Sequence, residues 1–132
     1  MLIGALAGGN SLPTLRAALI EAERASGRVV SRTHPRIDAP TLAGLLGAAG
    51  FTMPVVDVDR VTVRYRDLSS LVRDLRAMGA SSQLTERAPP LGRETLAAVA
   101  AAFEAMGNDG RTAEQFDLLH FLGWSPSGQA CR

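Results

Sequence analysis

Residues 115–124 place the tightest constraint on the fold of this chain. Large apolar side chains occur at both odd and even positions of this stretch: Phe116, Leu118, Leu119, Phe121, Leu122 and Trp124. Because a β-strand points successive side chains to opposite faces, such a strand is apolar on both faces. A strand of this kind is normally central in its sheet, with helices above and below it. We therefore predict an α/β fold built around residues 115–124.

Two further segments have extended patterns. The apolar run over residues 1–7 ends at Gly8 and Gly9, as a strand does when it enters a loop. Residues 55–65 alternate as a strand, with Val56 on one parity and Val63 on the other. A strict period of two would place these side chains on opposite faces, so we expect a bulge or twist near residues 59–60.

Four helices are predicted from apolar spacing and from residues typical of helix ends, over 12–26, 41–49, 67–78 and 94–106. Asn10 or Ser11 is expected to cap the first helix, and Asp67 is expected to cap the third. The inward-facing side chains are predicted to include Leu45 in the second helix and Leu96 in the fourth.

Composition excludes several classes of protein. Fourteen arginines, no lysine and thirteen acidic residues give a net charge of +1, too small for a protein that coats nucleic acid or a membrane surface. Hydrophobic residues at 46% and charged residues at 20% exclude wholesale disorder. The single cysteine, Cys131, excludes an intrachain disulfide and favours a reducing, cytoplasmic compartment. The first seven residues are too short for a signal peptide or a membrane span.

The short motifs are weak indicators of chemistry. Residues 4–11 match the spacing of a phosphate-binding loop, but Asn10 stands where a lysine must reach the outer phosphates. A glycine-rich turn before a capped helix explains the same residues. Asp57 and Asp59 point the same way along a strand, yet no second cluster of metal-ligating residues accompanies them, so we predict no metal site. Asp57 can instead pair with a neighbouring arginine, Arg60, Arg64 or Arg66.

Both histidines, and the arginines Arg73 and Arg76, can be interpreted either as functional residues or as ordinary structural ones. His34 lies in a polar loop, where it can serve as acid, base or hydrogen-bond donor, although a surface histidine before a proline is commoner. His120 is expected to be a hydrogen-bonded core histidine, and Trp124 is expected to pack in the core. Arg73 and Arg76 could hold an anion, but a solvated helix face is commoner.

Several segments, in this order, resemble class I S-adenosylmethionine-dependent methyltransferases. Residues 42–51 followed by 55–59 are similar to the last helix and sixth strand of that family. Residues 67–79 are similar to a helix inserted after that strand, and residues 112–126 resemble the antiparallel seventh strand. The branch they resemble holds the malonyl-carrier O-methyltransferase of biotin synthesis and the mitochondrial complex I assembly factor 5 type.

The resemblance implies the C-terminal half of a Rossmann-like sheet. Residues 1–6 resemble strand five, so the implied strands are five, six and seven, with six and seven antiparallel, an α+β arrangement if isolated. The implied domain covers residues 1–126, with a helical cap insertion at 67–107 and a tail at 127–132. The family binds its methyl donor on a glycine-rich turn after the first strand and an acidic residue ending the second, and nothing here matches either. We expect S-adenosylmethionine to serve the intact family member and not to bind this chain alone.

What the resemblance leaves is the acceptor side. Five residues fall in or beside the segments that would face the acceptor: His34, Tyr65, Arg73, Met78 and Ser81. The chain is thus expected to be the acceptor-binding part of a methyltransferase-like enzyme, inactive alone, with a protein or a carrier-bound acyl group as acceptor. The alternative is a non-enzymatic protein-binding or assembly module. The assembly-factor type is associated with arginine hydroxylation, which leaves methylation and hydroxylation both open. A homodimer, or pairing with a missing N-terminal half, is expected in either case.

Overall fold

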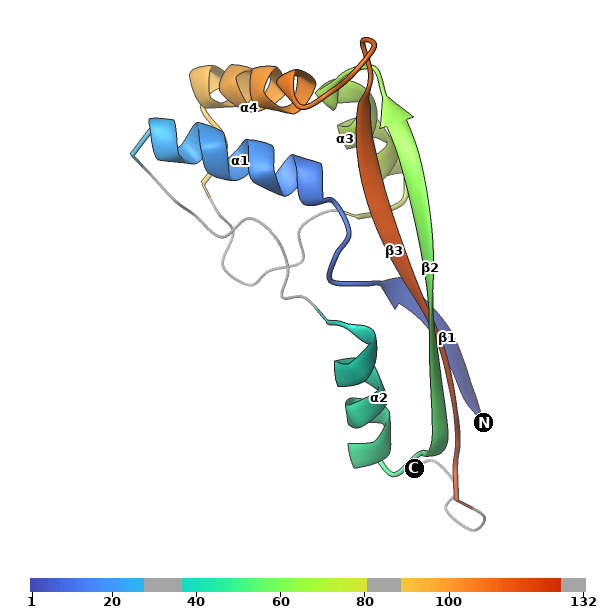
Figure 1. Ribbon diagram of the computed structural model, residues 1–132. Coiled ribbons are helices and arrows are strands. Elements are labelled where there is room, and N and C mark those ends of the chain that lie inside the picture. Colours follow the sequence, from blue (N-terminus) through green and yellow to red (C-terminus); the bar gives the residue numbers. More distant parts are fainter. Residues whose placement is uncertain (28–36, 81–88, 127–132) are drawn as a thin grey trace. The chain divides into compact units, whose positions relative to one another are not determined.

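A computed structural model describes residues 1–27, 37–80 and 89–126. In chain order its elements are β1 (Leu2–Ala7), α1 (Pro13–Ala25), α2 (Ala39–Ala48), β2 (Thr52–Tyr65), α3 (Leu68–Ala77), α4 (Arg93–Ala105) and β3 (Thr112–Trp124) (Figure 1). The predicted mixture of helices and strands is confirmed, and so is their order. The last strand begins at Thr112, somewhat earlier than its apolar pattern indicated.

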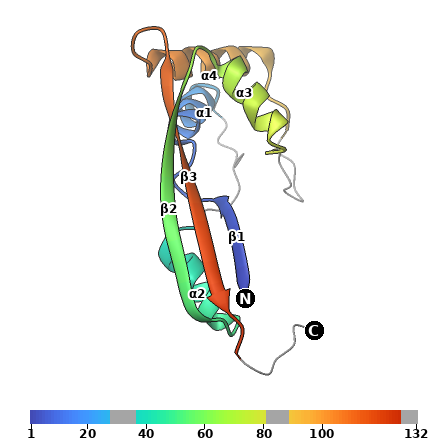
Figure 2. The ribbon, with the colours of Figure 1, turned by 90° about the vertical axis from the view of Figure 1, so that its right-hand side faces the viewer.

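The three strands form one antiparallel sheet in the order β1-β3-β2. β1 pairs with β3 in a register that places Leu2 opposite Gly123 and Ala7 opposite Leu118 (Figure 2). The prediction that residues 115–124 form a central strand is therefore confirmed.

The chain divides into two compact units, and the division falls within β2 and β3. The sheet unit comprises Met1–Ser11, Pro35–Val61 and Phe116–Arg132. The helical unit comprises Leu12–His34 and Thr62–Gln115.

The core of the sheet unit lies between α2 and one face of the strands. Leu42 and Leu46 from α2 pack with Leu119 from β3, and partly buried side chains surround them: Leu6, Ile37, Ala39, Phe51, Val56 and Phe121. Leu45 is 55% exposed, so its prediction as an inward residue is wrong. The reason is that α2 covers the sheet with one side only, which Leu42 and Leu46 occupy.

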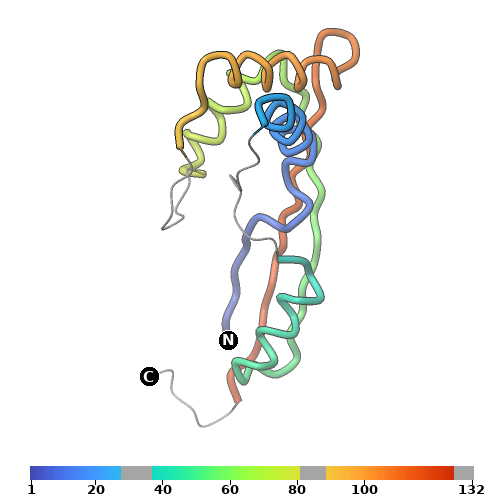
Figure 3. The backbone as a smooth tube through the Cα atoms, turned by 90° about the vertical axis from the view of Figure 1, so that its left-hand side faces the viewer, coloured from blue at the N-terminus to red at the C-terminus, as the bar shows by residue number. Residues whose placement is uncertain are grey.

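The helical unit is built on α1 and α4, which pack along each other, with α3 against α4 (Figure 3). Its most buried apolar residues are Ala18, Ala22, Tyr65, Leu68, Leu71, Val99 and Phe103. Asp67 caps α3 as predicted, since its carboxylate accepts a hydrogen bond from the Ser70 N–H at 2.7 Å. Leu96 is 49% exposed, so its predicted inward position is wrong, and Val99 and Phe103 carry the contact face of α4 instead.

Two expectations about β3 are wrong. His120 is an exposed residue rather than a core histidine, and Trp124 is 46% exposed rather than packed in the core. His120 is paired with Ala5 across β1, on the face opposite the one that Leu119 presents to α2. Among the described residues of the sheet unit, α2 covers one face of the strands, whereas helices were predicted on both.

The parity change predicted in residues 55–65 is present. Val56 is partly buried at an even position, whereas the half-buried Val63 and the buried Tyr65 stand at odd positions. The bulge near residues 59–60 that we proposed as its cause stays a prediction.

Candidate functional site

Tyr65, at the end of β2, is one of the five sequence-predicted acceptor residues and is buried in the helical unit. Its hydroxyl donates a hydrogen bond to the carboxylate of Asp74 on α3. Desolvation by burial raises the pKa of Tyr65, and the negative charge of Asp74 raises that pKa further. The phenol is therefore protonated near neutral pH and acts as a hydrogen-bond donor rather than as a nucleophile.

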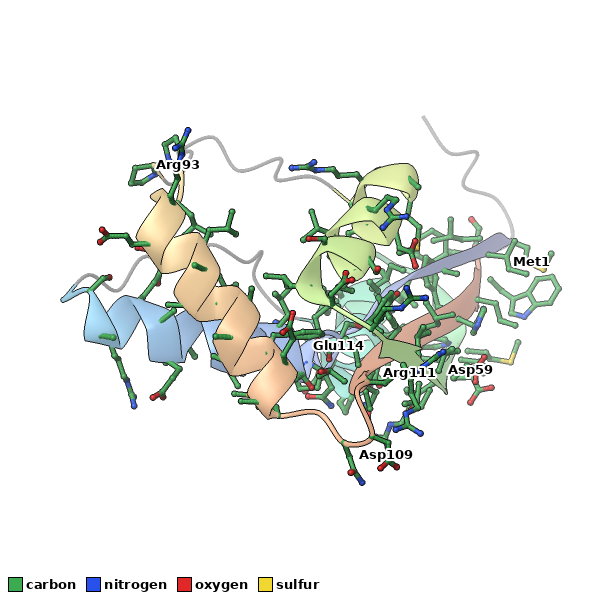
Figure 4. All side chains as sticks on the ribbon, turned by 90° about the horizontal axis from the view of Figure 1, so that it is seen from above. Met1, Asp59, Arg93, Asp109, Arg111 and Glu114 are labelled. Carbon is green, nitrogen blue, oxygen red and sulfur yellow. The ribbon has the colours of Figure 1, made fainter. Side chains whose placement is uncertain are left out.

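Glu114, on β3, is a second buried group of the helical unit, with only 1% of its surface exposed. One carboxylate oxygen accepts a hydrogen bond from the Thr14 N–H at 3.1 Å, and the other accepts one from the Leu15 N–H at 2.7 Å. Both N–H groups belong to the first turn of α1, beside which Glu114 lies in Figure 4. The Glu114 charge is also the smallest of the causes that raise the pKa of Tyr65.

This arrangement corrects the predicted cap of α1. Neither Asn10 nor Ser11 is the N-cap residue: Leu12 is, with a left-handed backbone and no side-chain cap hydrogen bond. The Ser11 hydroxyl instead accepts a hydrogen bond from the Asp117 N–H at 3.0 Å and donates one to the Asp117 carbonyl oxygen at 3.2 Å. A carboxylate from a distant strand thus satisfies the free N–H groups that the local sequence leaves unpaired.

Arg73 and Met78 were also predicted as acceptor residues, and both belong to the α3 region. Arg73 is exposed, and Met78, the C-cap residue of α3, is 62% exposed. The hydrogen bond between Asp74 and Tyr65 joins α3 to the end of β2. Tyr65, Arg73 and Met78, three of the five predicted acceptor residues, therefore belong to one unit. His34 and Ser81 lie outside the described residues.

The sheet unit holds a buried carboxylate that the sequence reasoning missed. Asp117 is 3% exposed, and its Oδ1 lies 3.7 Å from Nε of Arg60, whose side chain is 67% exposed. The Gly8 N–H donates to the Asp117 carbonyl oxygen at 2.7 Å. The signal that could have found Asp117 and Glu114 is an acidic residue inside a strand that is otherwise apolar.

The carboxylates of β2 do not gather into a metal centre. Asp57 Oδ1 accepts a hydrogen bond from the Val58 N–H at 2.9 Å, and Arg64 donates to the Asn108 carbonyl at 3.0 Å. Within residues 1–27, 37–80 and 89–126, no three His, Cys, Asp or Glu side chains lie together as metal ligands would.

The glycine-rich turn after β1 does not fit a nucleotide or a nucleoside cofactor. Its N–H groups are used internally: Gly8 donates to Asp117 and Gly9 donates to the Ile37 carbonyl at 2.7 Å. The start of α1, which would otherwise attract an anion, already receives the Glu114 carboxylate. A phosphate-binding loop over residues 4–11 is therefore excluded on the donors as well as on the missing lysine.

Comparison with known proteins gives consistent matches. The chain is 39% identical over 127 residues to the arginine-hydroxylase NDUFAF5, mitochondrial, of Danio rerio, covering 94% of this chain and 40% of that protein. It is 35% identical over 131 residues to the malonyl-[acyl-carrier protein] O-methyltransferase of Xylella fastidiosa, covering 98% of this chain and 43% of that protein. The human arginine-hydroxylase NDUFAF5 is 35% identical over 126 residues. No protein-family model matches the chain.

The chain is a homologue of these proteins of the class I S-adenosylmethionine-dependent methyltransferase family. The homology covers nearly the whole chain but only 40% and 43% of the lengths of the first two relatives. The family resemblance inferred from residues 42–59, 67–79 and 112–126 is confirmed. No helix in the described part of the chain is long and apolar enough to cross a membrane.

Proposed function

We propose that this chain supplies the acceptor-binding side of an S-adenosylmethionine-dependent methyltransferase-like enzyme. The observation that carries the proposal is the antiparallel pairing of β2 with β3, together with homologues that include malonyl-carrier O-methyltransferases. In the family, strands six and seven are the antiparallel pair. The strand assignment, the single domain over 1–126 and the helical insertion at 67–107 belong to this proposal.

The cofactor site is proposed to lie outside these residues. The glycine-rich turn of this chain has its donors occupied by Asp117 and Ile37, and the start of α1 is occupied by Glu114. We expect the chain alone to be inactive. Its own contribution is to hold the acceptor and to exclude water around it, which are the parts of such catalysis that depend on positioning.

The acceptor is proposed to contact the helical unit around α3. Arg73 offers an exposed cation on α3, and the buried Tyr65 contacts the same helix through its hydrogen bond with Asp74. A carrier-bound acyl group with a free carboxylate would pair with Arg73 there. Met78 would contribute apolar contact with the acceptor. His34 and Ser81 are also proposed to bind the acceptor.

Calorimetry tests the proposal directly. Titration of the chain with S-adenosylmethionine should give no binding heat, whereas titration with malonyl-acyl carrier protein should give a measurable affinity. Arg73→Gln should weaken that affinity, and Arg24→Gln, an exposed change on α1, should not. Micromolar binding of S-adenosylmethionine by this chain alone would contradict the proposal that the cofactor site lies outside these residues.

The alternative is a non-enzymatic protein-binding or assembly module, favoured by the apolar side chains left exposed on the sheet unit. Such a module would hold a protein partner without regard to Arg73. The proposed partners remain a second copy of the chain or a cofactor-binding half, and the proposed compartment is the cytoplasm. Sedimentation of the chain alone separates a monomer from a homodimer.

A further inference from the structure

The outward side of α3 is basic. Leu68 and Leu71 are buried on its inner side, whereas Arg73 and Arg76 are exposed. Residues three positions apart lie on the same side of a helix, so these two guanidinium groups are neighbours, about 4.5 Å apart along the helix axis. Arg66, which is exposed just before α3, adds a third cation. We call Arg66, Arg73 and Arg76 the arginine stripe.

The carboxylates next to the arginine stripe are engaged within the fold. Asp67 accepts a hydrogen bond from the Ser70 N–H, and Asp74 accepts one from a buried tyrosine hydroxyl. Hydrogen bonds from Ser70 lower the pKa of Asp67, and the charges of Arg66 and Arg73 lower it further, so both arginines lie near the start of α3. In the described part of the chain, no ion pair joins the stripe to a carboxylate. The carboxylates that would complement the stripe must therefore come from outside these residues.

The chemistry of the arginine stripe favours a partner that bears carboxylates. A guanidinium group keeps its charge at every physiological pH and binds a carboxylate through two parallel hydrogen bonds. In a partner helix, acidic residues three or four positions apart are spaced along the axis as Arg73 and Arg76 are. A helix with several such acids can therefore lie along α3 and meet the arginines in turn. A nucleic acid fits less well, because the net charge of +1 leaves no broad basic surface for a phosphate backbone.

The exposure of the arginine stripe determines how strong such a contact can be. Each exposed ion pair contributes little to binding, and dissolved salt screens it. Complementary charges at an exposed surface act mainly on the rate at which two proteins meet and on their orientation. A single helix lying along α3 also covers less area than a stable complex normally buries. The stripe therefore suits a partner that binds and leaves, rather than a permanent subunit.

We propose that the arginine stripe is the docking surface for an acidic helix of a transient protein partner. The inference goes beyond the function proposed above, because it concerns a protein surface and involves no methyl transfer. Arg73 is common to both proposals, whereas Arg66 and Arg76 belong to this one alone. The test therefore varies Arg66 and Arg76, and it needs neither S-adenosylmethionine nor an acyl group.

The experiment uses the intact chain and a defined peptide. The probe is a helix-forming peptide of about 14 residues, made of alanine with glutamate at i, i+4, i+7 and i+11, and the control peptide has glutamine in place of each glutamate. At millimolar concentration, the glutamate peptide should change the backbone amide NMR shifts of residues 66–78, and the glutamine peptide should not. The changes should shrink as NaCl is raised from about 50 mM to about 500 mM, because salt screens exposed charges.

Matched variants locate the contact. Arg66→Gln combined with Arg76→Gln should weaken peptide binding at least about threefold, because two exposed ion pairs are lost. Arg24→Gln combined with Arg93→Gln removes the same charge from exposed positions on α1 and α4 of the same unit, and it should leave binding unchanged. Amide shifts that are unchanged away from the substituted positions show that each variant keeps its fold. Absence of shift changes in α3, equal binding of the glutamine peptide, an equal loss in the control variant, or tighter binding of a short DNA duplex would each overturn the proposal.

Discussion

The carboxylate of Glu114 accepts a hydrogen bond at 2.7 Å from the backbone N–H of Leu15, which lies 99 positions earlier in the chain. The same carboxylate accepts a second bond from the Thr14 N–H at 3.1 Å. A residue of β3 thereby performs for α1 what an N-cap residue normally performs from within the helix. The start of α1 and the start of β3 consequently form one structural joint of the helical unit.

Replacement of Glu114 should destabilise the protein more than replacement of a surface acid. Glu114→Ala removes both acceptors from two N–H groups in a buried setting, and we expect a loss of about 1–3 kcal/mol in the free energy of unfolding. Glu114→Gln retains one acceptor oxygen and should lose less. Urea unfolding measures the effect, with Glu104→Ala, an exposed change on α4, as the control. A Glu114→Ala loss no larger than that of the control would contradict the capping role.

Titration of Tyr65 should occur above the ordinary tyrosine range. Burial raises its pKa above the usual value of 10.0, and Asp74 raises it further. Because the pKa is higher in the folded state, this contribution to stability is complete below about pH 10 and is lost as the pH rises through the folded pKa. Tyr65 is the single tyrosine of the chain, so ultraviolet absorbance follows it alone.

Two variants separate the causes of the Tyr65 shift. Asp74→Asn should lower the tyrosine pKa toward its usual value, because it removes the nearby negative charge. Tyr65→Phe should cost about 1 kcal/mol at neutral pH through the lost hydrogen bond and should abolish this alkaline loss of stability. An absorbance midpoint at the usual value in the unsubstituted chain would refute the burial argument.

Two caps should make stability fall in acid. The Ser70 N–H lowers the pKa of Asp67, and the Thr41 hydroxyl, followed by its N–H, lowers the pKa of Asp38. A depressed pKa contributes stability that is present above about pH 4 and is lost as the pH falls through the folded pKa. Asp67→Asn keeps a cap acceptor that does not titrate. The melting temperature of this variant should therefore fall less than that of the unsubstituted protein between about pH 5 and pH 2, the range in which carboxylates titrate. A melting curve series across that range checks the difference, and Asp59→Asn serves as the control.

The contrast between these caps shows what sequence could provide. Asp67 is recognisable because its partner, Ser70, lies three residues away and the helix pattern begins between them. The cap of α1 is invisible locally, because Glu114 reaches α1 only through the pairing of distant segments. For the same reason, apolarity on both sides identified β3 as central but did not reveal that the His120 side of the strand has no helix over it in the described chain.

The acceptor residues show the same limit. Tyr65 could be singled out as an aromatic residue at a strand end, but its partner Asp74 comes from the next element and depends on how α3 folds back. The prediction of Arg73 and Met78 rests on their place in a segment that resembles the family, and such a resemblance says nothing about exposure. Periodicity thus predicted the elements, whereas the cross-element contacts of Tyr65, Glu114 and Asp117 required the coordinates.

Gly4 and Gly44 should respond in opposite directions to alanine. A Cβ at Gly4 would lie 2.6 Å from Cζ of Phe121, a ring partly buried in the core of the sheet unit, whereas a Cβ at Gly44 would meet nothing within 4 Å. Gly4→Ala should therefore cost about 1–3 kcal/mol through overpacking. Gly44→Ala, inside α2, should gain about 0.5–1 kcal/mol from helix propensity. If Phe121 causes the Gly4→Ala cost, the added substitution Phe121→Leu should recover part of it in a double-mutant cycle.

Leu12, the residue that links Ser11 to α1, has a strained backbone conformation. Its φ of 60° lies in the left-handed region, which costs a residue with a side chain about 1–2 kcal/mol. Leu12→Ala keeps that strain and loses the half-buried side chain, whereas Leu12→Gly loses the same side chain and relieves the strain. The glycine variant should therefore unfold at higher urea concentration than the alanine variant, by about 1 kcal/mol in free energy. The reverse order would mean that the left-handed conformation at Leu12 is not adopted in solution.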